Sequence, residues 1–88
     1  MTSATDLKRL SDKIRKFQAA VERAGVDRVS DKIGRGAFSS FECAADALRR
    51  NQSLAIVSNF LGAAQERCED HLNLQSDEDV YSVLKTIR

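Results

Sequence analysis

The sequence has no proline and no tryptophan, and its 88 residues include only one tyrosine, one histidine and two cysteines. Cys43 and Cys68 form at most one disulfide, which excludes a protein built on a disulfide framework. Both cysteines lie in segments with helical periodicity, where a reduced cysteine packs as a small hydrophobic residue. We therefore expect a reducing compartment, either cytosolic or nuclear.

Long apolar runs are also missing. No stretch approaches the roughly 18–20 apolar residues that a membrane-spanning helix needs, so no membrane partner is expected. The polar residues 1–6 do not resemble the start of a signal peptide. With 42% hydrophobic and 31% charged residues, the composition favours a compact helical domain over a disordered chain.

Few residues are available for catalysis or metal binding. His71 is the only histidine, and the sequence has no glycine-rich phosphate loop. Cys68 and His71 have the spacing of half a zinc site, but a structural zinc ion needs four ligands. We favour a core cysteine and a histidine at a helix end. The protein is therefore not expected to be an enzyme or to use a metal, a cofactor or a small-molecule substrate.

The apolar periodicity predicts an all-α fold in a single domain, residues 1–88, with helices near 6–24, 27–33, 39–72 and 77–87. Thr5 or Asp6 is expected to cap the first helix, Gly25 to end it, and Asp27 to cap the second. The second helix should end in a turn at residues 34–36, where two glycines flank Arg35. Ser76 is expected to cap the last helix.

The third predicted helix is unusually long. Ser39 and Glu42 have the spacing of a capping box, with Phe38 at the staple position before them. From there a continuous helix to Leu72 would measure about 50 Å. Residues 51–53 are its weak point, because Ser53 could cap a new helix. A continuous or mildly kinked helix is favoured over a true break.

The second half of this long helix is apolar over a wide arc, which indicates burial on more than one side. A chain of this size buries only roughly 60–65% of its unfolded surface, so oligomerisation is the expected source of extra stability. The predicted dimer core consists of Leu54, Val57, Phe60, Leu61 and Ala64.

Charge is distributed unevenly along the chain. Residues 1–50 carry a net charge of +4, and residues 51–88 carry −3. Beside its apolar stripe, the first helix carries a basic edge of about 21 Å between Arg9 and Arg23. The cations of this edge are Lys8, Arg9, Arg15, Lys16 and Arg23.

Lysines and arginines on a rigid helix can contact the phosphates of a nucleic-acid duplex without reading its bases. Arg35, Arg49 and Arg50 could extend this surface. The alternative is an ordinary solvated helix face, since Asp12 and Glu22 interrupt the edge. Single-strand binding is disfavoured, because the sequence offers few aromatic side chains for stacking on bases.

One stretch of the first helix resembles a known family. Residues 10–14 (LSDKI), followed by residues 20–25 (AVERAG), are similar to the opening helix of the nodaviral double-stranded-RNA-binding suppressors of RNA silencing. A short segment punctuated by glycines then leads to a long helix with Cys43, an arginine pair and an aliphatic second half. The resemblance covers about residues 7–65.

This resemblance implies an antiparallel homodimer, a four-helix bundle of the two long helices of each chain. It implies sequence-independent binding along one face of an RNA duplex, through phosphates and 2′-hydroxyls. It also implies suppression of host RNA silencing by shielding that duplex, in the host cell cytoplasm if the chain is viral. The family's contact residues are not carried over, so the RNA-binding candidates come from the charge pattern.

The alternative function is that of a small protein-interaction module, either an anti-activator or an adaptor. Its docking surface would be an apolar helix face, such as Leu54/Val57/Leu61 or the stripe of Val80, Val83, Leu84 and Ile87. Both faces could instead belong to the internal core, which the small size of the domain favours.

Overall fold

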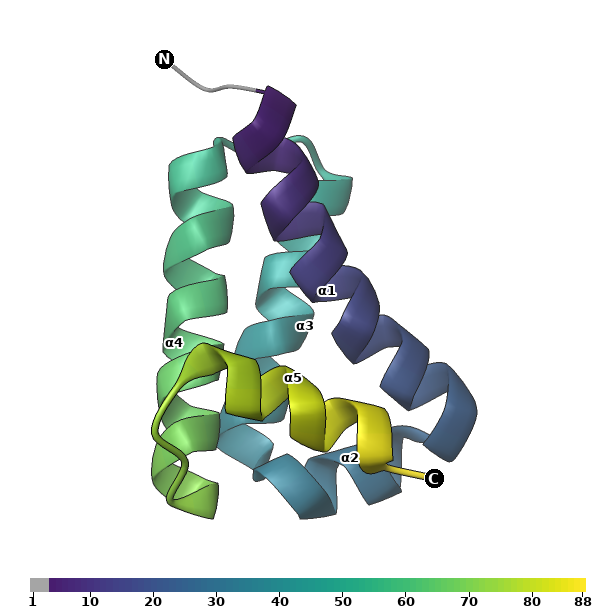
Figure 1. Cartoon of the computed structure of the whole chain (residues 1–88). Coiled ribbons are helices and arrows are strands. Elements are labelled where there is room, and N and C mark those ends of the chain that lie inside the picture. The colour runs from purple at the N-terminus through teal and green to yellow at the C-terminus, as the bar shows by residue number, and fades with distance from the viewer. Residues whose placement is uncertain (1–3) are drawn as a thin grey trace.

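The computed structural model describes residues 4–88, which form five helices and no strand. The helices are α1 (Ala4–Ala24), α2 (Val26–Ile33), α3 (Arg35–Arg49), α4 (Leu54–Leu72) and α5 (Asp77–Thr86). Figure 1 shows α3 and α4 running in opposite directions, with α1 crossing them obliquely and α5 lying across the lower half of the molecule near α2. The predicted all-α fold is confirmed.

Single glycines separate the first three helices. Gly25 and Gly34 have φ angles of +93° and +92°, a conformation that strains any residue with a Cβ atom. The Gly25 N–H donates to the Val21 carbonyl at 2.7 Å, so the predicted end of the first helix is confirmed. The predicted caps are wrong, because Thr5 and Asp6 lie within the first turn of α1 and Asp27 lies within that of α2.

The predicted capping box at Ser39 and Glu42 is also wrong. α3 begins at Arg35, so both residues lie inside the helix, and Gly36 belongs to its first turn. The turn at Gly34 is tight enough for the helix to restart at the next residue. Phe38 packs in the core as a helical residue, with 7% of its surface exposed, rather than as a staple before the cap.

The predicted long helix over residues 39–72 is wrong as well, because the helix ends at Arg49 and a new one begins at Leu54. Asn51 adopts the left-handed conformation with φ +57°, and the Gln52 N–H donates to the Ala47 carbonyl at 3.0 Å. Ser53 then caps α4, its Oγ accepting from the Ile56 N–H at 3.3 Å. The true break that the sequence left open is therefore the observed structure. It lets the two halves bury their apolar faces against each other.

α3 and α4 form an antiparallel helical hairpin, and small side chains line the interface between the two helices. Ala37, Ala44 and Ala47 of α3 are at most 2% exposed, and α4 buries Val57, Leu61, Ala64 and Cys68. Alanine side chains allow two helix axes to approach closely. The contact between α3 and α4 is the most extensive between any two helices of the described chain.

An aromatic cluster joins the hairpin to α1 and α5. The Phe17 and Phe41 rings stack with centroids 4.8 Å apart, and Phe38 meets Phe17 edge-on at 5.2 Å. Tyr81 of α5 lies edge-on to Phe41 at 6.3 Å. Such arrangements suit the ring quadrupoles and bury a large apolar area. Ser76 caps α5 as predicted, since its side chain accepts from the Asp79 N–H.

Most residues of the predicted dimer core are buried inside one chain, between α3 and α4. Val57, Leu61 and Ala64 are at most 2% exposed within one chain, so their assignment to a dimer interface is wrong. Leu54 is partly buried against the same core, and only Phe60, 37% exposed, faces outward. α3 folds back to provide the cover that a second subunit was expected to supply. A homodimer through other surfaces stays a prediction.

Two phenylalanines provide a matched test of this core. Phe41→Ala should lower the free energy of unfolding by about 3–5 kcal/mol, because it removes a fully buried ring and leaves a cavity. Phe60→Ala should cost less than about 1 kcal/mol in a monomer, because the ring is partly solvated already. Urea denaturation followed by circular dichroism measures both, and equal losses would contradict the assignment of Phe60 to the surface.

Candidate nucleic-acid interface

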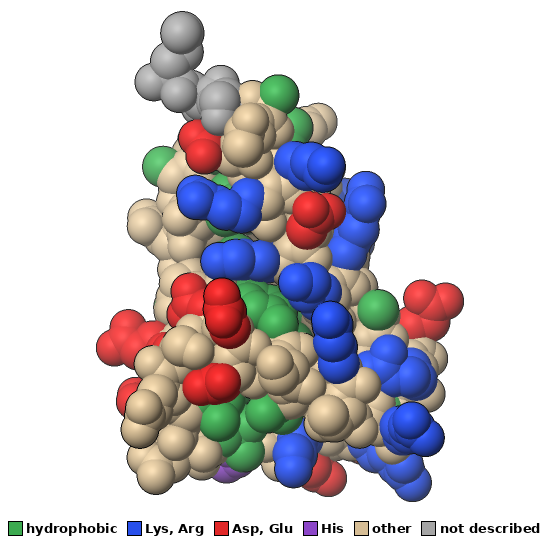
Figure 2. Space-filling view, in the orientation of Figure 1, with side chains coloured by type: hydrophobic (Ala, Val, Ile, Leu, Met, Phe, Trp, Pro, Cys, Tyr) green, Lys and Arg blue, Asp and Glu red, His purple; other side chains and the backbone are tan. Residues whose placement is uncertain are grey.

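The outer face of α1 carries the main group of sequence-predicted cations. The helix buries one stripe, Leu10, Ile14, Phe17 and Ala20, which fixes its orientation on the core. Lys8, Arg15 and Lys16 therefore lie on the exposed side. Figure 2 shows basic side chains in a band that follows α1 down to the lower right, with acidic side chains gathered at the lower left of the same face.

Charge neutralisation differs along this band. Within residues 4–88, no carboxylate forms an ion pair with Lys8, Arg15 or Lys16. The Lys16 ammonium lies 5.5 Å from the centroid of the Tyr81 ring, a cation–π distance that restrains its side chain. Arg9 pairs with Asp6 at 3.6 Å, but both side chains are well exposed, so the pair is weak. These four cations form the part of the predicted site that the structure brings together.

Arg23 has a structural role that the charge pattern did not reveal. Its Nε donates to the Ile87 carbonyl and its Nη2 to the Leu84 carbonyl, both at 2.8 Å. A further contact to the Lys85 carbonyl, at 3.4 Å, completes a clamp on the end of α5. Carbonyls at a helix C-terminus lack partners in the helix and carry partial negative charge, which suits a guanidinium group. Arg23 is therefore less available for phosphate than the sequence suggested.

Arg49 and Arg50 share one acidic partner. Asp46 lies 2.5 Å from Arg49 and 3.2 Å from Arg50, so the group carries a net charge of about +1 rather than +2. Both arginines are at the C-terminal end of α3, whereas Arg35 is its first residue. The structure therefore does not gather these three cations into one patch.

A polar network under the basic band was missed at the sequence level. The Tyr81 hydroxyl donates to Gln65 Oε1 at 2.6 Å, and Gln65 Nε2 donates to Asp77 at 3.1 Å. Lys13 of α1 approaches the same Asp77 at 3.9 Å. Burial, reinforced by the nearby Asp77 charge, raises the pKa of Tyr81 well above its usual value, so the hydroxyl stays a donor. The only sequence signal was Gln65, a polar residue beside the apolar seam of α4.

The residues suspected of metal or nucleophile chemistry are placed apart from any such site. Cys68 is fully buried, while His71 lies exposed in the last turn of α4 beside Gly34. Among residues 4–88, no three His, Cys, Asp or Glu side chains are grouped to hold a metal ion. The interpretation of Cys68 as a core residue is confirmed.

None of the five helices combines the length and the apolar character needed to cross a membrane, as judged over the part of the chain that the structure describes. Comparison with family models, with curated proteins and with solved structures finds no match for this chain.

The two thiols should differ in reactivity. Burial raises the pKa of Cys68 from its ordinary 9.0 to about 11, with a smaller effect of the Glu69 charge. At pH 8, Ellman's reagent should modify Cys43 quickly and Cys68 only after denaturation, since the thiolate is the reactive form. Cys43→Ser should abolish the fast reaction, and a fast thiol remaining in that variant would refute the burial of Cys68.

The same shift has a consequence for stability. Because the folded-state pKa of Cys68 exceeds the unfolded value, the buried thiol favours folding below pH 9, and this contribution is lost as the pH rises toward 11.

The clamp on α5 gives a separate prediction. Arg23→Ala should lower the free energy of unfolding by about 1–2 kcal/mol, because three carbonyls lose a charged donor. Arg15→Ala, on the same helix, should change it by less than about 0.5 kcal/mol. Amide hydrogen exchange should also accelerate in α5 of the Arg23 variant before it does so elsewhere. Equal behaviour of the two variants would contradict the clamp.

Proposed function

We propose that the protein binds double-stranded RNA without reading its sequence, with the outer face of α1 lying along the phosphate backbone. The observation that supports the proposal best is the exposure of Lys8, Arg15 and Lys16 without carboxylate partners in residues 4–88. An unpaired cation that binds a phosphate releases counterions without first losing an ion pair.

The rigidity of α1 also supports the proposal that it binds a duplex. Lys8 and Lys16 are separated by about 12 Å along a continuous helix. Ile14 and Phe17, 1% and 3% exposed, hold the opposite side of this segment in the core. The cations are therefore presented at fixed spacing, which suits a regular duplex more than a flexible single strand.

The aromatic residues support the choice of a duplex. Proteins that bind single strands stack bases on exposed aromatic rings. Phe17, Phe38, Phe41 and Tyr81 are at most 7% exposed, and Phe60 is the one phenylalanine among residues 4–88 with a large exposed area. Phe60 lies on α4, a different helix from the one that carries the basic face.

Most residues of the two apolar faces named for the alternative function are buried within one chain, although Leu54 and Val83 are only partly buried. Val57 and Leu61 lie in the core with Val80, Leu84 and Ile87, all at most 7% exposed. They are not free to dock a partner helix while the domain stays folded.

The homodimer was expected from the small size of the domain as well as from the resemblance, whereas the suppression of RNA silencing comes from the resemblance alone. A second copy would double the number of phosphate contacts. Because residues 50–53 separate α3 from α4, however, that dimer would not be the bundle of long helices implied by the family. Shielding of a duplex from processing enzymes requires binding first, so duplex binding is the decisive measurement.

A gel-shift titration over a series of salt concentrations tests the proposal. Affinity for duplex RNA should fall steeply with salt, and the triple variant Lys8→Ala/Arg15→Ala/Lys16→Ala should reduce the slope of log K against log[salt] by about 2–3. The double variant Arg49→Ala/Arg50→Ala should reduce it by about 1, because both arginines share Asp46.

Circular dichroism confirms that each variant is folded. Absence of binding to duplex RNA at low salt would exclude the proposal. Equal affinity for duplex DNA would argue against recognition of 2′-hydroxyls and correct the assignment of RNA. Equal slopes for the triple variant and the unchanged protein would move the interface away from α1.

A further inference from the structure

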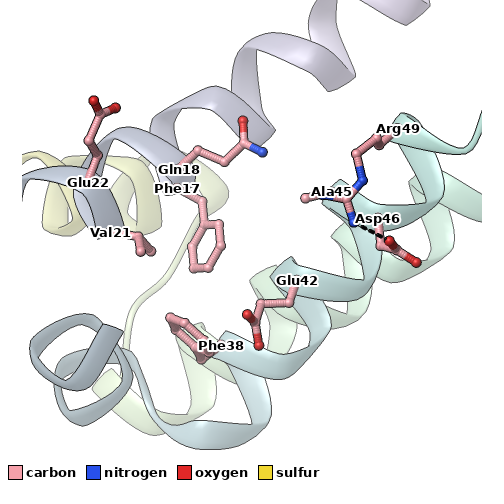
Figure 3. A pocket seen from close by; sticks show the side chains of 9 residues that line it. All are labelled: Phe17, Gln18, Val21, Glu22, Phe38, Glu42, Ala45, Asp46 and Arg49. Atoms are coloured by element: carbon pink, nitrogen blue, oxygen red, sulfur yellow. Dashed lines mark hydrogen bonds and ion pairs between the residues drawn. The ribbon is translucent and has the colours of Figure 1, made fainter. Parts of the chain in front are cut away.

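A groove lies between α1 and α3, and Lys8, Arg15 and Lys16 are not among the residues that line it. Its volume is about 330 Å³, at the lower end of the range for small-molecule sites, roughly 300–1,000 Å³. α1 lines it with Phe17, Gln18, Val21 and Glu22, and α3 lines it with Phe38, Glu42, Ala45, Asp46 and Arg49. Figure 3 shows the Phe17 and Phe38 rings meeting at its base.

One short side chain, Ala45, lies in the α3 wall of the groove. Ala45 is partly buried and occupies the α3 position between Glu42 and Arg49, where a larger apolar side chain would reach toward α1. α1 packs against α3 much less extensively than α4 does. The space between the two helices therefore stays open to solvent above the phenylalanine rings.

Three of the four charged side chains that line the groove are carboxylates, namely Glu22, Glu42 and Asp46. Arg49 is bound to Asp46 at 2.5 Å, and Arg50 contacts the same carboxylate at 3.2 Å, so these three groups together carry a charge of about +1. Glu42 forms no ion pair with any of residues 4–88, and Figure 3 shows its carboxylate near the Phe38 ring. The Glu22 carboxylate points outward from the rim, and the Gln18 amide extends toward α3.

We propose that this groove binds a small organic ammonium ion with an aromatic body. The aromatic body lies against the apolar lining formed by Val21, Ala45 and the small exposed parts of the Phe17 and Phe38 rings, and the ammonium group faces the Glu42 carboxylate. A cation close to aromatic rings is also attracted by their quadrupoles. An anionic ligand of the same shape would have to approach Glu42 and could use only an arginine that is already paired.

Three probes that share a phenyl ring separate charge from shape. Titration of ¹⁵N-labelled protein with 2-phenylethylammonium should give saturable shifts in the backbone amides of residues 17–22 and 38–49. The neutral 2-phenylethanol should bind about two- to fivefold more weakly, since a solvent-accessible ion pair contributes little. The anion 3-phenylpropionate should bind more weakly still.

Ethylammonium, which lacks the ring, controls for general attraction to carboxylates. Saturable shifts with this ion, or shifts by 2-phenylethylammonium that centre on the acidic start of α5, would overturn the proposal. Absence of saturable shifts in the groove, or equal affinity for the cation and the anion, would overturn it too.

Variants give a second test. Glu42→Gln should remove the preference for the ammonium probe over the alcohol, whereas Glu66→Gln, on the exposed side of α4, should not. Ala45→Leu should fill the groove and abolish binding of the phenyl probes, whereas Ala55→Leu, exposed on α4, should leave it unchanged. Retained preference in Glu42→Gln would overturn the proposal even if Ala45→Leu did not fold. Lys8, Arg15 and Lys16 do not line the groove, so this result does not depend on the three cations that support RNA binding best.

Discussion

The four residues between Arg49 and Leu54 determine the rest of the structure. Asn51 in the left-handed conformation and Ser53 at the cap of α4 reverse the chain, so that α3 and α4 cover each other's apolar faces. Without this reversal, α3 would not cover Val57, Leu61 and Cys68, and only a second chain could shield them from solvent. With it, a short chain has a core of its own, onto which α1 and α5 pack.

α1 combines two roles on its opposite sides. Its inner stripe inserts Phe17 between Phe38 and Phe41, and its outer side presents Lys8, Arg15 and Lys16 to solvent. A polyanion bound outside would therefore contact side chains whose backbone is already fixed by packing, and little ordering of the main chain would be needed. The acidic residues gathered on the same face in Figure 2 leave α1 as the favourable approach for negative charge.

Part of the local structure could be predicted from the sequence, namely where a local signal determines it. Gly25 at the end of α1 and the serines that cap α4 and α5 act within one or two turns. The break after Arg49 was harder to predict, because Asn51 and Gln52 are tolerated in helices and no glycine or proline marks the turn. Only the gain from folding α3 onto α4 decides against a continuous helix.

The candidate site was predictable only in part. A basic edge can be identified from helical spacing, but the spacing does not show that Arg23 turns to the α5 carbonyls or that Asp46 serves both Arg49 and Arg50. Apolar periodicity likewise shows that Val57 and Leu61 are buried without showing what covers them. The groove at Ala45 depends on the angle between two helices, for which the sequence carries no local signal.

The hydrogen bonds from Arg23 to the end of α5 also have a consequence for the order of folding. They join residues 61 to 64 positions apart, whereas α3 and α4 meet across a turn of only a few residues. Loop-closure entropy grows with the length of chain enclosed, so the hairpin has the smaller entropic barrier. On this entropic argument, we expect the hairpin of α3 and α4 to form before α5 docks on α1.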